Sequence, residues 1–226
     1  MRKDKAILIF SDLEGTILRE NDGYYSSEDM YAFLAQIDKL QQLTGAEVHL
    51  HLVSPIYRDD MQKIMDQIDR EITKYNRLHR EHDDIPDIES ATYTPERHII
   101  QTDFLEDRLV PLKKPINAKE YDTSSYGKST YVKTWCDTYN SMNQLLMAIY
   151  CGNDFNDLAA MELVRRQKYG FVVCPANSKP SVKEKAIHSS DKTDLQGITD
   201  GIKAINEKIS QRVAPIAEQE KMISKE

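Results

Sequence analysis

Four apolar runs along the chain have the length and composition of β-strands. Residues 6–10, 145–150 and 170–174 show almost no polar alternation, which is typical of strands buried on both faces of a parallel sheet. Residues 47–53 alternate in part. A further strand is predicted near residues 97–102, where the sequence reads RHIIQT.

Between these runs, apolar residues recur at spacings of three and four, which predicts amphipathic helices. The first helix is expected to begin after Ser26, with Asp29 completing a capping box, and to end at Gly45. Further helices are predicted over residues 58–82, 129–140, 155–166 and 196–211. Because strands and helices alternate, we predict an α/β fold with a doubly wound parallel sheet.

Length and charge restrict the kind of protein. A chain of 226 residues suits one α/β domain, which we place at residues 1–210, with residues 211–226 as a tail. The net charge of -7 disfavours nucleic acid and anionic membranes as partners. No apolar run approaches the length of a transmembrane helix. A small ligand or a metal ion is the expected partner.

Cysteine and histidine usage indicates structural roles. The three cysteines, Cys136, Cys151 and Cys174, lack the spacing of a metal site and are expected to be buried in a cytoplasmic protein. His49 and His51 share one face of a predicted strand, but no third ligand lies near them in the sequence. We therefore do not assign them to a metal.

Polar residues follow three of the predicted strands. In open α/β sheets, ligands bind beyond the carboxyl ends of the strands, so these residues are expected to meet at one edge. A cluster of carboxylates is repulsive unless a cation neutralises it, and oxygen ligands of this kind suit Mg²⁺. The residues are Asp12, Glu14, Ser54, Asn153, Asp154 and Asp157.

Lys128 is a second candidate. It stands in the sequence YGKST, at the expected start of a helix, where a cation faces the positive end of the helix dipole at a cost of up to about 1 kcal/mol. A phosphate bound by this lysine, the backbone N–H groups and Ser54 would offset that cost; a solvated surface lysine is the alternative. A nucleotide-binding P-loop is excluded, because Asp122 stands where that motif needs glycine.

The order of these motifs resembles that of the haloacid dehalogenase superfamily of phosphohydrolases, and within it the Cof-like sugar phosphatases. The resemblance covers roughly residues 6–54 and 126–205. DLEGT is similar to the Asp-x-Asp-Gly-Thr motif of this family, HLVSP supplies the Ser or Thr after strand two, and GNDFNDLAAM matches the Gly-Asp-x-x-Asn-Asp motif. CPANSKPSVKEKA and DLQGITDGIKAI look similar to the stretches that follow it.

The resemblance implies a Mg²⁺-dependent phosphatase that cleaves the phosphate monoester of a small phosphorylated metabolite. Asp12 would be the nucleophile and carry an aspartyl-phosphate, and Glu14 would be the acid and base and bind the metal through its backbone carbonyl. Ser54 and Lys128 would bind the phosphoryl oxygens. Asp157, with Asn153 or Asp154, would complete the metal shell.

The sequence departs from the family pattern at two positions. Glu14 stands where the family usually has aspartate, which changes reach more than acidity; enolase-phosphatases of the same superfamily carry a similar Asp-x-Glu-Gly-Thr motif. Asn153 replaces a metal-binding aspartate, which weakens attraction for a cation. A non-catalytic relative that binds a phosphorylated ligand or a protein, and a phosphotransferase, are therefore the alternative functions.

The Cof-like group carries a substrate-specificity cap between the Ser/Thr of strand two and the lysine. Here residues 55–127 contain a long helix and a predicted strand, which leaves too few residues for a separate domain. We expect a reduced or absent cap in residues 83–127. An uncapped site implies a larger phosphorylated substrate or cover from another subunit, as in a homo-oligomer.

Overall fold

The computed structural model describes residues 4–54, 58–79, 87–88 and 123–223. Its sheet consists of β1 (Ala6–Ser11), β2 (Glu47–Leu52), β3 (Leu145–Cys151), β4 (Gly170–Cys174) and β5 (His188–Ser189). The helices are α1 (Ser27–Thr44), α2 (Arg58–His79), α4 (Thr123–Ser141), α5 (Leu158–Arg165), α6 (Pro180–Lys183) and α7 (Asp194–Ile223), with a 3₁₀ turn η1 (Phe155–Asp157) before α5.

The sheet is parallel throughout and has the strand order β2-β1-β3-β4-β5. β1 lies second from one edge of the sheet, and the chain passes from it to β2 at that edge and then returns past β1 to β3. This reversal places the carboxyl ends of β1, β2 and β3 next to one another, which is where ligands bind in open parallel sheets. The prediction of an α/β fold with a parallel sheet is confirmed.

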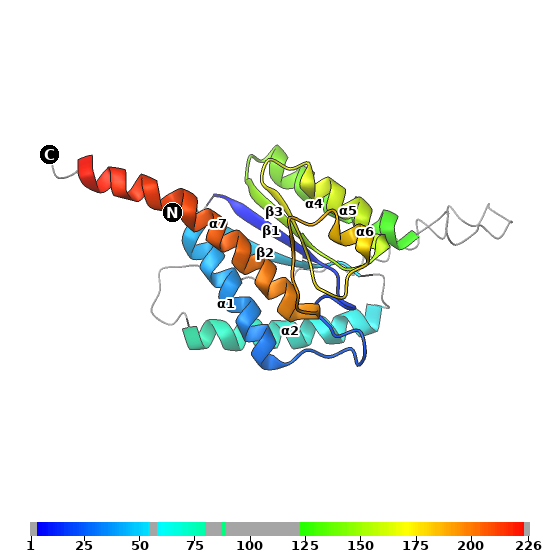
Figure 1. Ribbon diagram of the computed structural model, residues 1–226. Helices are drawn as coiled ribbons and strands as arrows, with labels where there is room; N and C mark the ends of the chain where they lie inside the picture. Colours follow the sequence, from blue (N-terminus) through cyan, green and yellow to red (C-terminus); the bar gives the residue numbers. More distant parts are fainter. Residues whose placement is uncertain (1–3, 55–57, 80–86, 89–122, 224–226) are drawn as a thin grey trace.

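Helices cover both faces of the sheet (Figure 1). In β1, Ile7 and Ile9 face the core formed with α1, α2 and α7, whereas Leu8 and Phe10 face the core formed with α4 and α5. All four of these side chains are fully buried. Burial on both faces explains why this strand appears in the sequence as an uninterrupted apolar run.

The ends of α1 match the sequence prediction. The Ser26 side chain accepts a hydrogen bond from the Asp29 N–H at 3.0 Å and so caps the first turn. Gly45 ends the helix with a φ of 67°, a left-handed conformation that glycine adopts without a steric cost. Short-range chemistry therefore determines both ends of this helix.

Other elements differ from their predicted limits. The helix α4 begins at Thr123, so Lys128 lies in its second turn and not at its start, as the sequence had indicated. The helix α7 continues to Ile223, through most of the segment predicted as a tail, and β5 and α6 had no predicted counterpart. The predicted strand at 97–102 and nearly all of the predicted reduced cap lie outside the described residues.

The predicted structural residues are buried. Cys136, Cys151 and Cys174 are free thiols inside the core, and burial raises the pKa of Cys136 to about 12. The ring of His51 packs between Phe10 and Trp135 and its Nδ1 lies 3.0 Å from the Tyr131 hydroxyl. Within the described part of the chain, no helix is long and apolar enough to cross a membrane.

Close contact between α7 and β4 generates the first testable prediction. A Cβ added to Gly201 of α7 would lie 2.0 Å from Cγ1 of Val173 in β4, and a buried valine has little rotamer freedom with which to yield. We expect Gly201→Ala to lower the free energy of unfolding by about 1–3 kcal/mol, although alanine favours helix. Urea denaturation followed by circular dichroism measures this change.

Two variants test the cause. Lys203→Ala, at an exposed position of the same helix, should change stability by less than about 0.5 kcal/mol. Gly201→Ala should cost less in a Val173→Ala background than in the wild type, because the smaller side chain removes the clash. Equal cost in both backgrounds would show that contact with Val173 is not the reason.

Candidate active site

The backbone brings three strand ends together. Asp12 follows β1, and its N–H donates to the carbonyl of Cys151 at the end of β3, at 2.9 Å. The Val53 N–H donates to the Ser11 carbonyl at 2.8 Å, which places Ser54 beside the end of β1. The predicted site residues Asp12, Ser54 and the loop after β3 therefore share one edge of the sheet.

Lys128 reaches this edge from α4. Its Nζ lies 2.8 Å from Oδ1 of Asp12 and 2.8 Å from Oδ1 of Asp157, and it donates to Oδ1 of Asn156 at 3.2 Å. The three side chains of the ion pairs are almost fully buried, with 2%, 6% and 0% of their surface exposed for Lys128, Asp12 and Asp157. We call these three residues the buried triad.

Asp157 is the most heavily bonded member of the buried triad. Its Oδ1 accepts hydrogen bonds from Lys128 and from the Tyr150 hydroxyl, each at 2.8 Å. Its Oδ2 accepts from the backbone N–H groups of Asn153 and Asp154 at 2.9 and 3.1 Å. Four donors thus occupy the two oxygens of this carboxylate, which is about as many as it can accept.

Burial and charge change the protonation behaviour of the site. Burial, together with the negative charge of Asp157, raises the pKa of Asp12 to about 7, although Lys128 opposes this rise. Burial acts to lower the pKa of Lys128, but the charges of Asp12 and Asp157 outweigh it and raise the pKa. Burial and the charge of Asp157 raise the pKa of Tyr150 well above its usual value, so its hydroxyl remains a donor.

Glu14 differs from Asp12 in its surroundings. It lies in the tight turn after β1, and its side chain is exposed, whereas Asp12 is buried. Gly15 follows with a φ of 69°, and a Cβ at this position would lie 2.2 Å from Nδ2 of Asn153. Glycine is required here both for its conformation and for the close approach of Asn153.

Asn177, which the sequence did not single out as a site residue, supports this turn. Its Nδ2 donates to the Gly15 carbonyl at 2.9 Å and to Oδ1 of Asp194 at 3.1 Å, and its Oδ1 accepts from the Asp194 N–H at 3.1 Å. One side chain thus connects the turn after β1 to the start of α7. Its place in the CPANSK stretch was the available signal, but its partners are more than 15 residues away.

Two polar atoms at the site have no hydrogen-bond partner among the described residues. They are Oγ of Ser54 and Oδ1 of Asn153, both buried from solvent. A buried polar atom without a partner costs about 1–3 kcal/mol, so a ligand or water is the expected partner. A hydroxyl suits a phosphoryl oxygen, and an amide oxygen suits a hard cation such as Mg²⁺.

The donor set is therefore compatible with a cation bound by mixed oxygens. Asp12 and Asn153 bring a carboxylate and an amide oxygen to this edge, and among the described residues that amide oxygen has no hydrogen-bond partner. Within the described ranges, no three His, Cys, Asp or Glu side chains are grouped as a metal site. Asp154 uses Oδ1 to cap η1, accepting from the Phe155 N–H at 2.6 Å.

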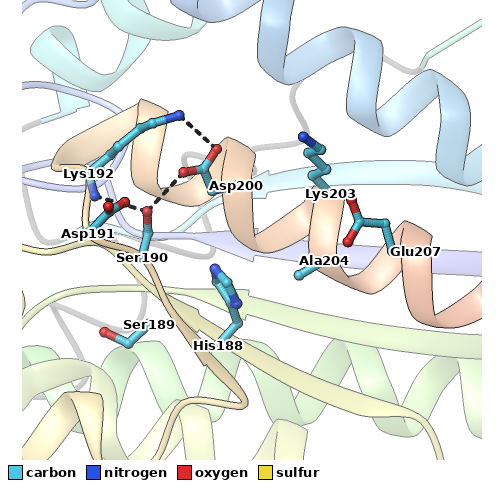
Figure 2. A pocket seen from close by; sticks show the side chains of 9 residues that line it. All are labelled: His188, Ser189, Ser190, Asp191, Lys192, Asp200, Lys203, Ala204 and Glu207. Carbon is cyan, nitrogen blue, oxygen red and sulfur yellow. Dashed lines mark hydrogen bonds and ion pairs between the residues drawn. The ribbon is translucent and has the colours of Figure 1, made fainter.

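A polar hollow of about 570 Å³ between β5 and α7 is separate from these residues (Figure 2). Asp200 accepts hydrogen bonds there from Lys192 and Ser190, each at 3.1 Å. His188 and Glu207 also line it. None of the predicted site residues lines this hollow, so we do not consider it the candidate active site.

Comparison with known proteins gives structural similarities only. No family model and no curated protein matches the sequence. A solved structure from Thermoplasma acidophilum is 13% identical, covers 88% of this chain and 98% of its own, and has a TM-score of 0.46. A haloacid dehalogenase-like hydrolase from Bacillus subtilis is 14% identical, with coverage of 90% and 89% and a TM-score of 0.44.

A further similar structure is 3-deoxy-D-manno-octulosonate 8-phosphate phosphatase from Moraxella catarrhalis, in complex with magnesium and phosphate ions. It is 14% identical, the match covers 90% of this chain and 85% of that one, and the TM-score is 0.45. Similarities of this size do not establish a family.

The buried triad generates the second prediction. Lys128→Met would leave two buried carboxylates facing each other without a cation, so we expect the free energy of unfolding to fall by about 3–5 kcal/mol. Lys133→Met is the control, because Lys133 pairs with Asp137 on the exposed side of the same helix and should cost at most about 1 kcal/mol. Denaturation with urea gives both values.

A third variant identifies the cause of the loss. Adding Asp12→Asn to Lys128→Met removes one of the two unpaired charges and should restore part of the stability. If Lys128→Met costs no more than Lys133→Met, or if Asp12→Asn lowers stability further, the buried ion pairs do not stabilise this site as described.

Proposed function

We propose that this chain is a Mg²⁺-dependent phosphatase of the haloacid dehalogenase type, which hydrolyses a phosphate monoester through Asp12. The observation that carries the proposal is the buried triad at the carboxyl ends of the strands, beside which Ser54 Oγ and Asn153 Oδ1 have no hydrogen-bond partner in the part of the chain that the structure describes. A carboxylate, a fixed cation and a free hydroxyl at one sheet edge are what phosphoryl transfer to a carboxylate needs.

Asp12 is the proposed nucleophile. An oxygen of Asp12 forms a bond to phosphorus while the ester bond to the leaving oxygen breaks, and Glu14 gives that oxygen its proton. Water then attacks the aspartyl-phosphate, loses its proton to Glu14, and the bond between Asp12 and phosphorus breaks. The exposed Glu14 side chain is free to serve both steps, because it is not fixed in the core.

Ser54 and Lys128 are proposed to bind the phosphoryl oxygens. Among the described residues the Ser54 hydroxyl has no hydrogen-bond partner, whereas all three protons of Lys128 are engaged. The longest of these three contacts, 3.2 Å to Asn156, involves the only uncharged acceptor and is the one that a phosphoryl oxygen would replace. Lys128 would then keep both carboxylates in place during the reaction.

The proposed ligands of Mg²⁺ are Asp12, the backbone carbonyl of Glu14 and Asn153, with Asp154 and Asp157 as the remaining candidates. Bound there, the ion would neutralise charge that develops on the phosphoryl group. Asp157 is the least available of the five, because its two oxygens already accept four hydrogen bonds. Asn153 is the most available, because its amide oxygen has no other partner among the described residues.

Phosphate release tests the proposal. We expect p-nitrophenyl phosphate or a member of a panel of metabolite phosphates to be hydrolysed with Mg²⁺ and not with chelator. Asp12→Asn should reduce kcat at least about a thousandfold, because the nucleophile is lost. Asp137→Asn, an exposed aspartate on α4, is the matched control and should retain wild-type activity. Release that persists in Asp12→Asn would contradict the proposed nucleophile.

A binding-only protein is the second candidate, and Asn153 is the observation that favours it. A neutral ligand attracts a cation less strongly than aspartate does, by about 1 kcal/mol or more at a separation of 4 Å. A folded wild type that binds phosphate but releases none from any substrate would favour this candidate. A phosphotransferase would instead release little phosphate and pass the group to an added acceptor alcohol.

Asn153→Asp tests the role of this position toward the metal. We expect the Mg²⁺ affinity, measured by calorimetry on the purified chain, to increase about fivefold or more. Asn156→Asp is the control, because it adds the same charge to the same loop at a side chain that contacts Lys128. An equal increase in both variants would mean that the added charge acts through its field and not as a ligand.

A further inference from the structure

We infer that Tyr150 is a positioning residue that holds Lys128 in place through Asp157. The inference rests on the proposed function, because the step that Tyr150 supports is the transfer of the phosphoryl group to Asp12, during which Lys128 is proposed to contact the phosphoryl oxygens. Nothing in the sequence pattern marks this residue, which lies within the apolar run of β3.

Tyr150 lies in strand β3, and its side chain extends to Asp157 at the edge of the sheet. It is fully buried in β3, on the face of the sheet that packs against α4 and α5. Its hydroxyl donates to Oδ1 of Asp157 at 2.8 Å, and the same oxygen lies 2.8 Å from Nζ of Lys128. A continuous line of short polar contacts therefore leads from Tyr150 through Asp157 and Lys128 to Asp12.

The Tyr150 hydroxyl is one of four donors to the Asp157 carboxylate, and it limits how that carboxylate can turn. The backbone N–H groups of Asn153 and Asp154 hold Oδ2. With Tyr150 on one side of Oδ1, the plane of the carboxylate is fixed and a single direction remains for Lys128. Without the hydroxyl, the carboxylate could rotate and Lys128 could move away from Asp12.

Gly152 is consistent with a site built around this contact. A Cβ at Gly152 would lie 2.5 Å from Oδ2 of Asp157 and 2.9 Å from Cε1 of Tyr150. The glycine between β3 and Asn153 therefore leaves the space in which the tyrosine ring and the carboxylate meet. The absence of a side chain at Gly152 is therefore needed for the contact between Tyr150 and Asp157.

A purely structural role predicts a different result. A buried tyrosine hydroxyl needs a partner wherever it lies, and Tyr131 supplies a second example in the same core, with its hydroxyl 3.0 Å from Nδ1 of His51. Neither Tyr131 nor His51 belongs to the proposed machinery. If Tyr150 were only a satisfied core tyrosine, removal of either hydroxyl would lower stability and leave the reaction unchanged.

The experiment compares Tyr150→Phe with Tyr131→Phe in the full chain. With the substrate that the wild type hydrolyses best, we expect Tyr150→Phe to lower kcat about tenfold with KM within twofold of the wild type. Tyr131→Phe should lose stability as well but keep kcat within twofold. A folded Tyr150→Phe with wild-type kcat, or equal losses of kcat in both variants, would overturn the inference.

A second measurement remains informative if the wild type releases no phosphate, an outcome that overturns the proposed function. Tyr150→Phe is combined with Lys128→Met, or with Lys128→Gln if the methionine variant does not fold, and unfolding by urea is measured. We expect the two changes to be coupled by about tenfold in the unfolding equilibrium constant, whereas Tyr131→Phe and the lysine change should be additive. Additivity for Tyr150→Phe would overturn the positioning role.

Discussion

The arrangement of the site depends on one buried lysine between two carboxylates. Lys128 lies 2.8 Å from Asp12 and from Asp157, and these residues come from α4, from the end of β1 and from the turn before α5. Two buried carboxylates this close would repel each other without a cation. The ion pairs therefore connect α4 and the turn before α5 to the edge of the sheet, and a ligand that broke them would leave buried charges unpaired.

The same charges limit what the site attracts. When Asp12 is ionised, one cation and two carboxylates leave a single negative charge in the buried triad, which repels a bare phosphate and attracts a divalent cation. Because of this negative charge, the metal would bind before the substrate in the proposed mechanism, and its positive charge would then attract the phosphoryl group. With asparagine and not a third carboxylate at position 153, the proposed metal site carries less negative charge and would attract a cation less strongly.

Features that depend on neighbouring residues could be predicted from the sequence, whereas contacts between residues far apart in the chain could not. The apolar runs, the Ser26 cap and the Gly45 stop depend on neighbouring residues, so β1 to β4 and the ends of α1 were predicted correctly, whereas β5 was not predicted. The segment TSSYG at the start of α4 has no apolar period, so the sequence predicted the beginning of this helix too late in the chain. Likewise, the sequence pattern shows Tyr150 only as a residue of an apolar strand, and the hydrogen bond from its hydroxyl to Asp157 is known only from the structure.

Asp12 and Glu14, the two acids of the DLEGT motif, differ in burial. This difference explains how position 14 can hold glutamate where aspartate was expected. Asp12 is buried and paired, so a longer side chain there would displace Lys128. Glu14 is exposed, and only its backbone is constrained, by Gly15 and by the hydrogen bond from Asn177 to the Gly15 carbonyl. One additional methylene therefore alters the reach of the proposed acid and base without disturbing Asp12, the proposed nucleophile. The position tolerates glutamate because its side chain, unlike that of Asp12, is not part of the buried triad.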